Sequence, residues 1–297
     1  MKRPAALGGG HGLSVSLGAL RLLGLEPTAV VTMADDGGSS GRLRRDLGLP
    51  PPGDLRMALL ALADPTAEAR DLFGYRFERG DLAGHNLGNL ILASLTDLRG
   101  GFEEALATAS RWLRIAGRVL PSTMVPVRLL GSVEGQTVEG QVAIRDAWGR
   151  VDRVWLEPGD AEAVPDAVAA VRDADLVLLG PGSIFTSVVP NLLVPELGAA
   201  IAAASDRVVY LCNLEPQPGE TSGFSPEAHL AALLAHCQGL QVPLVLCQRP
   251  ASAEAMARES AAFAELGARV LHADLADPDA PGRHDPARLA SALEELG

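Results

Sequence analysis

The chain has 297 residues, 47% of them hydrophobic, which is enough to bury the core of one large domain. Its formal net charge of −12 argues against a nucleic-acid partner, because phosphate contacts need clustered Lys and Arg, and the basic run at 42–46 (RLRRD) ends in an acid. No apolar run reaches the roughly 18 residues that a membrane span needs, and glycine at position 8 interrupts the apolar start too early for a signal peptide. We therefore expect a cytoplasmic protein without a membrane span.

The first 36 residues predict a strand, a helix and a second strand. Residues 3–10 (RPAALGGG) are an apolar run that ends in glycines, and leucines at 13, 17, 20 and 23 then recur at helical spacing. Residues 28–36 (TAVVTMADD) form a second apolar run, which ends in two acids. Such a unit should be parallel and right-handed.

Two inserts are predicted after the second strand. Residues 54–118 carry long Leu and Ala patterns with no convincing strand, which indicates a helical insert. Residues from about 119 to 156 place β-rich runs around the turn-like EGQ and AWGR, which favours a small antiparallel β insert.

Parallel order is expected to return after the second insert. Four apolar runs (ADLVLLGPGS, DRVVYLCNLEP, VPLVLCQRP and ARVLHADL) end in polar or turn residues, and helical patterns separate them. We therefore predict an α/β fold in a single domain over residues 1–297, with a doubly wound, mostly parallel, Rossmann-like sheet, a helical insert and a small antiparallel β insert.

Polar residues cluster where the predicted parallel strands end, and this is where open α/β sheets bind ligands. Glycine-rich turns there let the backbone approach a phosphate at a helix N-terminus, so two such turns suit a diphosphate, although tight packing alone would also explain them. The candidate ligand-binding residues on this edge are Gly9, Gly10, His11, Gly12, Asp35, Asp36, Gly37, Gly38, Ser39, Ser40, Gly180, Pro181, Gly182, Ser183, Thr186, Asn213, Gln217 and Thr221.

The helical insert adds a second group of candidates, Asp54, Arg56, His85, Asn86 and Asn89. Asp54 follows a Pro-Gly turn, and helix capping alone explains it well. Arg56 lies in a first helical turn, where its charge opposes the helix dipole, so we expect a phosphate or carboxylate partner. Asn86 and Asn89 are three residues apart on one helical face, which favours a binding role for this group.

The acids Asp35 and Asp36 leave three interpretations open. They could hold a metal, orient a sugar hydroxyl or form a solvated turn, and they are the candidates for a catalytic role if there is one. The turn GGGHG at 8–12 does not fit GxGxxG and has no Walker lysine, which disfavours an NAD-dependent dehydrogenase. An acid after the second strand is nevertheless what a ribose-binding dinucleotide fold has.

Six motifs in this order resemble a known family. They are GGGHGLSVSLGAL, VVTMADDGGSSGRLR, PPGDLRMALLALA, GHNLGNLILASL, LGPGSIFTSVVPNLLV and CNLEPQPGETSGFS, and they span residues from about 5 to 250. The chain resembles the bacterial YvcK-type proteins, labelled gluconeogenesis factors, of the superfamily of the 2-phospho-L-lactate transferase CofD. His11 and Met57 depart from the family pattern, which usually has Thr and Asn there, so contacts of those side chains are in doubt.

The resemblance implies a CofD-like domain that binds UDP-sugars, notably UDP-N-acetylglucosamine, and acts in cell shape, cell-wall synthesis and gluconeogenic growth. Such a regulator needs no cofactor for binding, and cell-wall regulatory proteins are its implied partners. The transferase branch implies the alternative, a phospholactate-type transfer to the deazaflavin Fo, in which Asp35 and Asp36 would hold Mg²⁺. An exposed sheet edge and the superfamily predict a homodimer.

Overall fold

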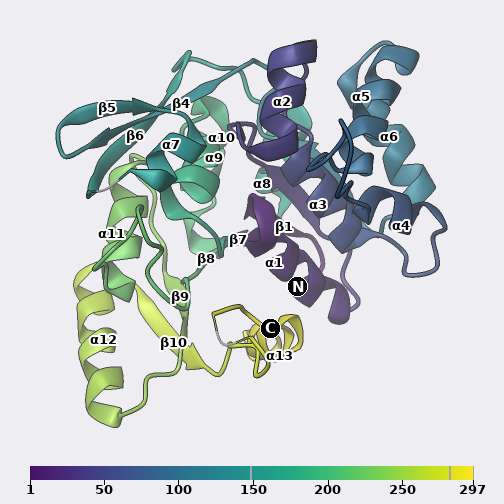
Figure 1. Ribbon diagram of the computed structural model, residues 1–297. Helices are drawn as coiled ribbons and strands as arrows, with labels where there is room; N and C mark the ends of the chain where they lie inside the picture. Colours follow the sequence, from purple (N-terminus) through teal and green to yellow (C-terminus); the bar gives the residue numbers. More distant parts are fainter. Residues whose placement is uncertain (148, 281, 297) are drawn as a thin grey trace.

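A computed structural model describes residues 1–147, 149–280 and 282–296. A seven-stranded parallel sheet with the order β10-β9-β8-β7-β1-β2-β3 forms the centre, and a three-stranded antiparallel sheet with the order β5-β4-β6 lies beside it (Figure 1). This confirms the predicted α/β class. The parallel strands are β1 (Pro4–Gly8), β2 (Thr28–Val31), β3 (Arg118–Pro121), β7 (Leu176–Leu179), β8 (Val208–Leu211), β9 (Leu244–Gln248) and β10 (Arg269–Ala273).

The helices and the small sheet cover both faces of the central sheet. The antiparallel strands are β4 (Arg128–Val133), β5 (Gln136–Glu139) and β6 (Val151–Glu157). The helices are α1 (Gly10–Leu22), α2 (Gly38–Leu47), α3 (Gly53–Leu62), α4 (Ala69–Gly74), α5 (Leu87–Arg99), α6 (Phe102–Leu113), α7 (Gln141–Asp146), α8 (Pro165–Asp173), the π-helical turn η1 (Ile184–Val188), α9 (Val189–Leu192), α10 (Pro195–Ala203), the 3₁₀ turn η2 (Ser205–Arg207), α11 (Pro226–Ala235), α12 (Ala253–Glu265) and α13 (Pro286–Glu294).

Side chains alternate along the buried strands and so divide the core into two layers. Leu7 and Leu179 point to the layer that contains α8 to α12 and the antiparallel sheet. Ala6 and Leu178 point to the layer that contains α1, α3, α5, α6 and α13. Because both faces of the sheet are buried, only the ends of the strands remain open to a ligand.

Two boundaries differ from the sequence-based expectation. Residues 118–121 do not belong to the β insert: β3 pairs in parallel with β2, from Thr28↔Arg118 to Val31↔Pro121, and the antiparallel sheet begins at Arg128. The helical segment begins before residue 54, because α2 begins at Gly38 and buries Ser39 and Ser40 in its first turn.

Among the described residues, no single helix combines the length and apolar composition needed to cross a membrane. The segments Ile184–Leu192 and Pro195–Ala203 reach that length and composition only when they are taken together, and an 85° bend separates them.

Candidate functional site

The strand order of the central sheet reverses between β1 and β7. From β1 the chain moves to β2 on one side, and from β7 it moves to β8 on the other side. The connections that follow β1 and β7 therefore run to opposite sides of the sheet, and such a switch point is where doubly wound sheets bind ligands. Both predicted glycine turns, 9–12 and 180–183, lie there.

Close packing against neighbouring segments explains two glycines of the turn after β1. A Cβ atom on Gly12 would lie 2.1 Å from the Pro181 carbonyl oxygen, and one on Gly9 would lie 2.3 Å from a carboxylate oxygen of Asp54. Gly10 has a φ of +58°, which favours glycine. The Gly-rich sequence thus brings the start of α1 against both the turn after β7 and the start of α3.

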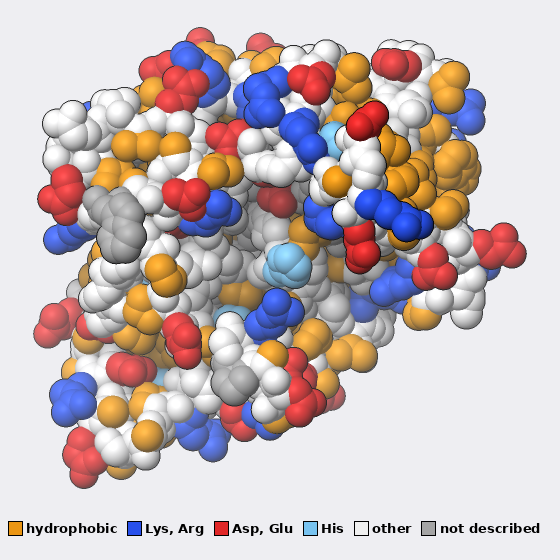
Figure 2. Space-filling view, in the orientation of Figure 1, with side chains coloured by type: hydrophobic (Ala, Val, Ile, Leu, Met, Phe, Trp, Pro, Cys, Tyr) orange, Lys and Arg blue, Asp and Glu red, His pale blue; other side chains and the backbone are white. Residues whose placement is uncertain are grey.

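A cavity of about 580 Å³ lies at the switch point, within the size range of small-molecule sites. Figure 2 shows a hollow across the middle of this face, with basic, acidic and His side chains along its walls. Of the predicted residues, the cavity is lined by His11, Gly12, Pro181, Gly182, Asn213 and Gln217.

The C-terminal segment also lines the cavity, which the sequence did not indicate. Asp277, Arg283 and His284 line the cavity from the loop between β10 and α13. His284 is buried, and its Nε2 lies 3.0 Å from the Cys212 carbonyl oxygen at the end of β8. Burial lowers the pKa of His284 to about 4, so the neutral imidazole donates this hydrogen bond and ties the loop to the sheet.

The two acids after β2 point to different partners. Asp36 accepts a hydrogen bond from the Val142 amide (3.0 Å), so it holds the start of α7 beside the central sheet. Asp35 accepts from the Gly37 amide (2.9 Å) at the start of α2 and lies near Asp54. The structure therefore places Asp35 near Asp54 of α3 as well as near Asp36.

Burial and neighbouring carboxylates raise the pKa values of both Asp35 and Asp54. Burial, with a further contribution from Asp35, raises the pKa of Asp54 to about 7, although the nearby Gly10 amide and Arg56 lower it. Burial also raises the pKa of Asp35. The sequence suggested that Asp54 caps its own helix, but the structure shows no such cap. Asp54 instead faces the start of α1. Carboxylates with raised pKa values are candidates for function, although neither Asp35 nor Asp54 lines the cavity at the switch point.

We expect Asp54→Asn to flatten the dependence of stability on pH. Because the folded pKa is about 7 and the unfolded value is roughly 4, the native state binds the extra proton, and the free energy of unfolding falls as pH rises from 4 to 7. With allowance for partial exposure, the wild type should lose on the order of 2 kcal/mol more than the variant between pH 5 and pH 8.

Urea unfolding in metal-free buffer at the two pH values measures this difference. Asp160→Asn, which changes an exposed acid after β6, is the matched control and should behave as the wild type. Equal pH slopes for wild type and Asp54→Asn would contradict the raised pKa.

The residues predicted from the helical insert bind mainly one another. Arg56 Nε donates to Asn89 Oδ1 (3.0 Å) and its Nη1 to the Phe73 carbonyl oxygen (3.2 Å), while burial lowers its pKa to about 10. Asn86 caps α5 by accepting from the Gly88 amide. His85 Nδ1 lies 3.2 Å from Ser39 Oγ. These contacts hold α3 and α5 together. The polar side chains that the sequence suggested for a ligand therefore already hydrogen-bond to other groups of the protein.

The turn after β7 is held by residues of the loop after β8. Asn213 exchanges two hydrogen bonds with the Gly182 backbone, at 3.0 and 2.9 Å. Thr221 Oγ1 accepts from the Gln217 amide (2.8 Å) and so closes the loop on itself.

Glu220 is a buried carboxyl group beside the turn after β7 that sequence reasoning missed. It is 1% exposed, and its Oε1 accepts from Thr186 Oγ1 (2.7 Å), whereas its Oε2 has no hydrogen-bond partner among the described residues. Burial raises the pKa of Glu220, and the hydrogen bond from Thr186 partly offsets the shift. The start of η1, which was expected to face a phosphate, thus already has an internal carboxyl group.

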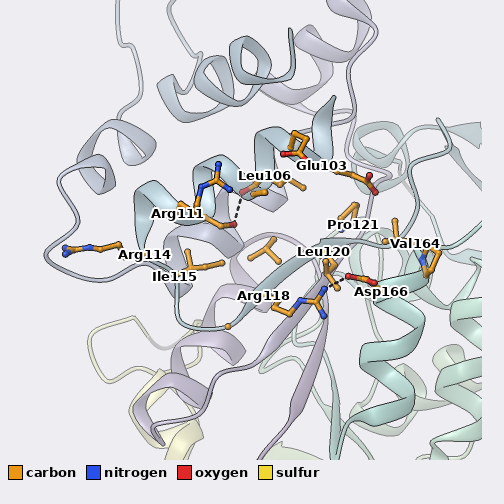
Figure 3. A pocket seen from close by; sticks show the side chains of 16 residues that line it. Glu103, Leu106, Arg111, Arg114, Ile115, Arg118, Leu120, Pro121, Val164 and Asp166 are labelled. Carbon is orange, nitrogen blue, oxygen red and sulfur yellow. Dashed lines mark hydrogen bonds and ion pairs between the residues drawn. The ribbon is translucent and has the colours of Figure 1, made fainter. Parts of the chain in front are cut away.

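A second cavity, of about 760 Å³, lies beside the edge strand β3 and is shown in Figure 3. Arg111 of α6 and Arg114, which follows α6, line it, and Arg118 of β3 pairs with Asp166 of α8. No residue predicted from the sequence as part of the site lines it. The switch-point cavity, which six of the predicted residues line, is therefore the candidate site.

Comparisons with known proteins agree with this architecture. Residues 5–283 match the family model described as 2-phospho-L-lactate transferase CofD. The chain is 46% identical to the gluconeogenesis factor of Bacillus subtilis over 78% of its own length and 74% of that protein. It is 44% identical to the gluconeogenesis factor of Halalkalibacterium halodurans, over 80% of this chain and 74% of that protein.

A solved structure shows the same fold. The crystal structure of a member of the UPF0052 family from Bacillus halodurans superimposes with a TM-score of 0.90 at 38% identity, over 99% of this chain and 98% of that one. Since the family model covers nearly the whole domain and the relatives are matched over most of their length, the chain belongs to the family of 2-phospho-L-lactate transferase CofD, and its homologues there are gluconeogenesis factors.

Proposed function

We propose that this protein is a regulatory protein that binds a nucleotide sugar of the UDP-N-acetylglucosamine type and acts in cell shape, cell-wall synthesis and gluconeogenic growth. The observation that carries the proposal is the cavity of about 580 Å³ at the switch point, walled by both glycine turns and by the loop after β8. The relatives named gluconeogenesis factor support the physiological part. The homodimer and the cell-wall partners stay predictions.

The polar groups at this edge suit a ligand that combines phosphates with hydroxyls. Asp35 follows β2, the position from which an acid accepts ribose hydroxyls in dinucleotide-binding folds. Glu215 and Asp277 add carboxylates inside the cavity, and His11 and Arg283 add basic groups. In our proposal the carboxylates bind ribose or sugar hydroxyls and the basic groups face the diphosphate.

Calorimetric titration tests the proposal. UDP-N-acetylglucosamine should bind saturably, at one site per chain, both with and without Mg²⁺. Ser14→Phe should abolish binding, because Ser14 lines the cavity from α1 and a phenyl ring there would fill part of it. A melting temperature within a few degrees of the wild type controls for folding of the variant. The absence of binding to the nucleotide sugar, together with binding of Fo, would overturn the regulatory proposal.

The second candidate function is a CofD-like transfer of a phospholactate-type group to Fo. The observation in its favour is the Asp35–Asp54 pair, since Mg²⁺ prefers such hard carboxylate oxygens. Within the described residues, no group of three or more His, Cys, Asp or Glu is placed to hold a metal, so substrate oxygens would complete the coordination. Asp35 and Asp54 would hold the ion, which would neutralise charge on phosphoryl oxygens. Nucleotide binding that requires Mg²⁺ would favour this candidate.

A further inference from the structure

A third cavity, of about 430 Å³, lies at the carboxyl ends of β2 and β3, on the far side of β1 from β7. Met33 lines it from the end of β2, and its two walls are the segment 48–51 between α2 and α3 and the segment 123–127 between β3 and β4. Among the described residues, none lines both this cavity and the switch-point cavity. The volume is in the lower part of the range of small-molecule sites.

Both walls of this cavity are held in place by the protein itself. In the first wall, Pro50 and Pro51 fix the backbone φ angles. In the second wall, the Val125 amide donates to Thr123 Oγ1 (3.0 Å), and the Thr123 hydroxyl donates to the Glu162 carbonyl oxygen (2.6 Å) before α8. The cavity is therefore preorganised, so a ligand does not have to order its walls on binding.

Arg44 of α2 supplies the charge in this cavity. Its Nη2 donates to the Val127 carbonyl oxygen of the second wall, while its Nε and Nη1 make no hydrogen bond within the described part of the chain. Burial raises the pKa of the neighbouring Asp35, and the charge of Arg44 opposes part of that shift, yet among the described residues Arg44 forms no ion pair. The guanidinium therefore has N–H groups left for a ligand.

The rest of the lining is apolar and has few hydrogen-bond donors. The apolar side chains are those of Met33, Leu49, Pro50, Pro51, Met124, Val125, Pro126 and Val127. Proline has no amide hydrogen, so the three prolines supply no backbone donor. A diphosphate would lose its hydration here with one cation to compensate for it, which is unfavourable. A ligand with one anionic group on an apolar body matches the lining.

We infer that this cavity is a second ligand site, which binds a small apolar organic anion with its charged group on Arg44 and its apolar body between the two walls. Guanidinium groups form strong, charge-assisted hydrogen bonds to such anions. Met33 and Met124 suit the apolar body, because the flexible thioether side chain adapts to ligands of different shape. This ligand differs from the nucleotide sugar both in its chemistry and in its place on the sheet.

Fluorescence titration with a matched pair of probes tests the inference. Anilinonaphthalene sulfonate carries one anionic group, and N-phenylnaphthylamine has the same rings without that group. The wild type should bind both probes saturably. Arg44→Gln should weaken binding of the sulfonate about tenfold and leave binding of the neutral probe within about twofold. Arg45→Gln, which changes the exposed neighbour in α2 outside the cavity, should bind both probes as the wild type does.

Two further variants fill the cavity from opposite walls. Leu49→Trp and Val125→Trp should each abolish saturable binding of both probes, and a melting temperature within a few degrees of the wild type controls for folding. Octanoate, an apolar carboxylate, should displace the sulfonate from the wild type.

The outcome does not depend on whether the protein binds a nucleotide sugar. A wild type that does not bind the sulfonate would overturn the inference, as would sulfonate binding that is unchanged in Arg44→Gln and in both cavity-filling variants. Displacement of the sulfonate by UDP-N-acetylglucosamine would place the probe in the switch-point cavity and would also contradict the inference.

Discussion

Gly12→Ala should destabilise the protein by about 3 kcal/mol and abolish binding in the switch-point cavity. The added Cβ would lie 2.1 Å from the Pro181 carbonyl oxygen, 2.6 Å from its carbonyl carbon and 2.9 Å from the Gly182 Cα. All three atoms belong to the backbone, so no side chain can rotate away. The variant must therefore push α1 away from the turn after β7, which changes two walls of the cavity at once. Urea unfolding measures the loss of stability, and calorimetry measures the loss of binding.

Gly18→Ala on the same helix is the matched control for this experiment. Its added Cβ would meet the Pro286 Cβ at 3.5 Å, an ordinary van der Waals distance. Alanine also favours the helix over glycine by about 0.5–1 kcal/mol, so this variant should be as stable as the wild type or more stable. If Gly12→Ala behaved like Gly18→Ala, the close contact between the two turns would be wrong.

Glu220→Ala should lower the free energy of unfolding by about 3 kcal/mol. The Oε1 atom of this buried carboxyl group accepts from Thr186 Oγ1 (2.7 Å). Truncation leaves the Thr186 hydroxyl without its partner in the interior and removes the group that holds the start of η1. Thermal and urea unfolding of the variant measure the cost.

Glu220→Gln separates the acceptor role from the charge. The amide keeps one acceptor oxygen and nearly the same shape, and it removes the cost of burying a carboxylate whose pKa is raised. We expect this variant to lose only about 1 kcal/mol. If Glu220→Ala unfolded at the same urea concentration and temperature as the wild type, the carboxyl group would not hold the start of η1.

The fold could be predicted from the sequence because buried parallel strands and their helices have distinct periods. The leucines of α1 and the apolar runs of β1, β2 and β7 indicated the crossover unit and the later parallel order. β3 was misassigned for a physical reason. It is four residues long, ends at Pro121 and is followed closely by an antiparallel sheet, while its partner β2 lies before the whole helical insert.

The site was harder to predict because a polar side chain at a strand end has either a ligand or a protein group as its partner. Asn89 and Asn213 are of a residue type that often binds ligands. In the structure, however, Asn89 accepts from Arg56, and Asn213 accepts from the Gly182 amide. The sequence contains no local signal for these pairings, which arise only when distant segments pack together. Arg283 was missed for the same reason, since the contact of His284 with the end of β8 brings its loop to the cavity.

A crystal structure of the protein with UDP-N-acetylglucosamine tests the central claim most directly. We expect the nucleotide sugar in the cavity between the turns that follow β1 and β7. A ligand in the cavity beside β3, or no bound ligand at saturating concentration, would contradict the assignment of the switch-point cavity as the functional site.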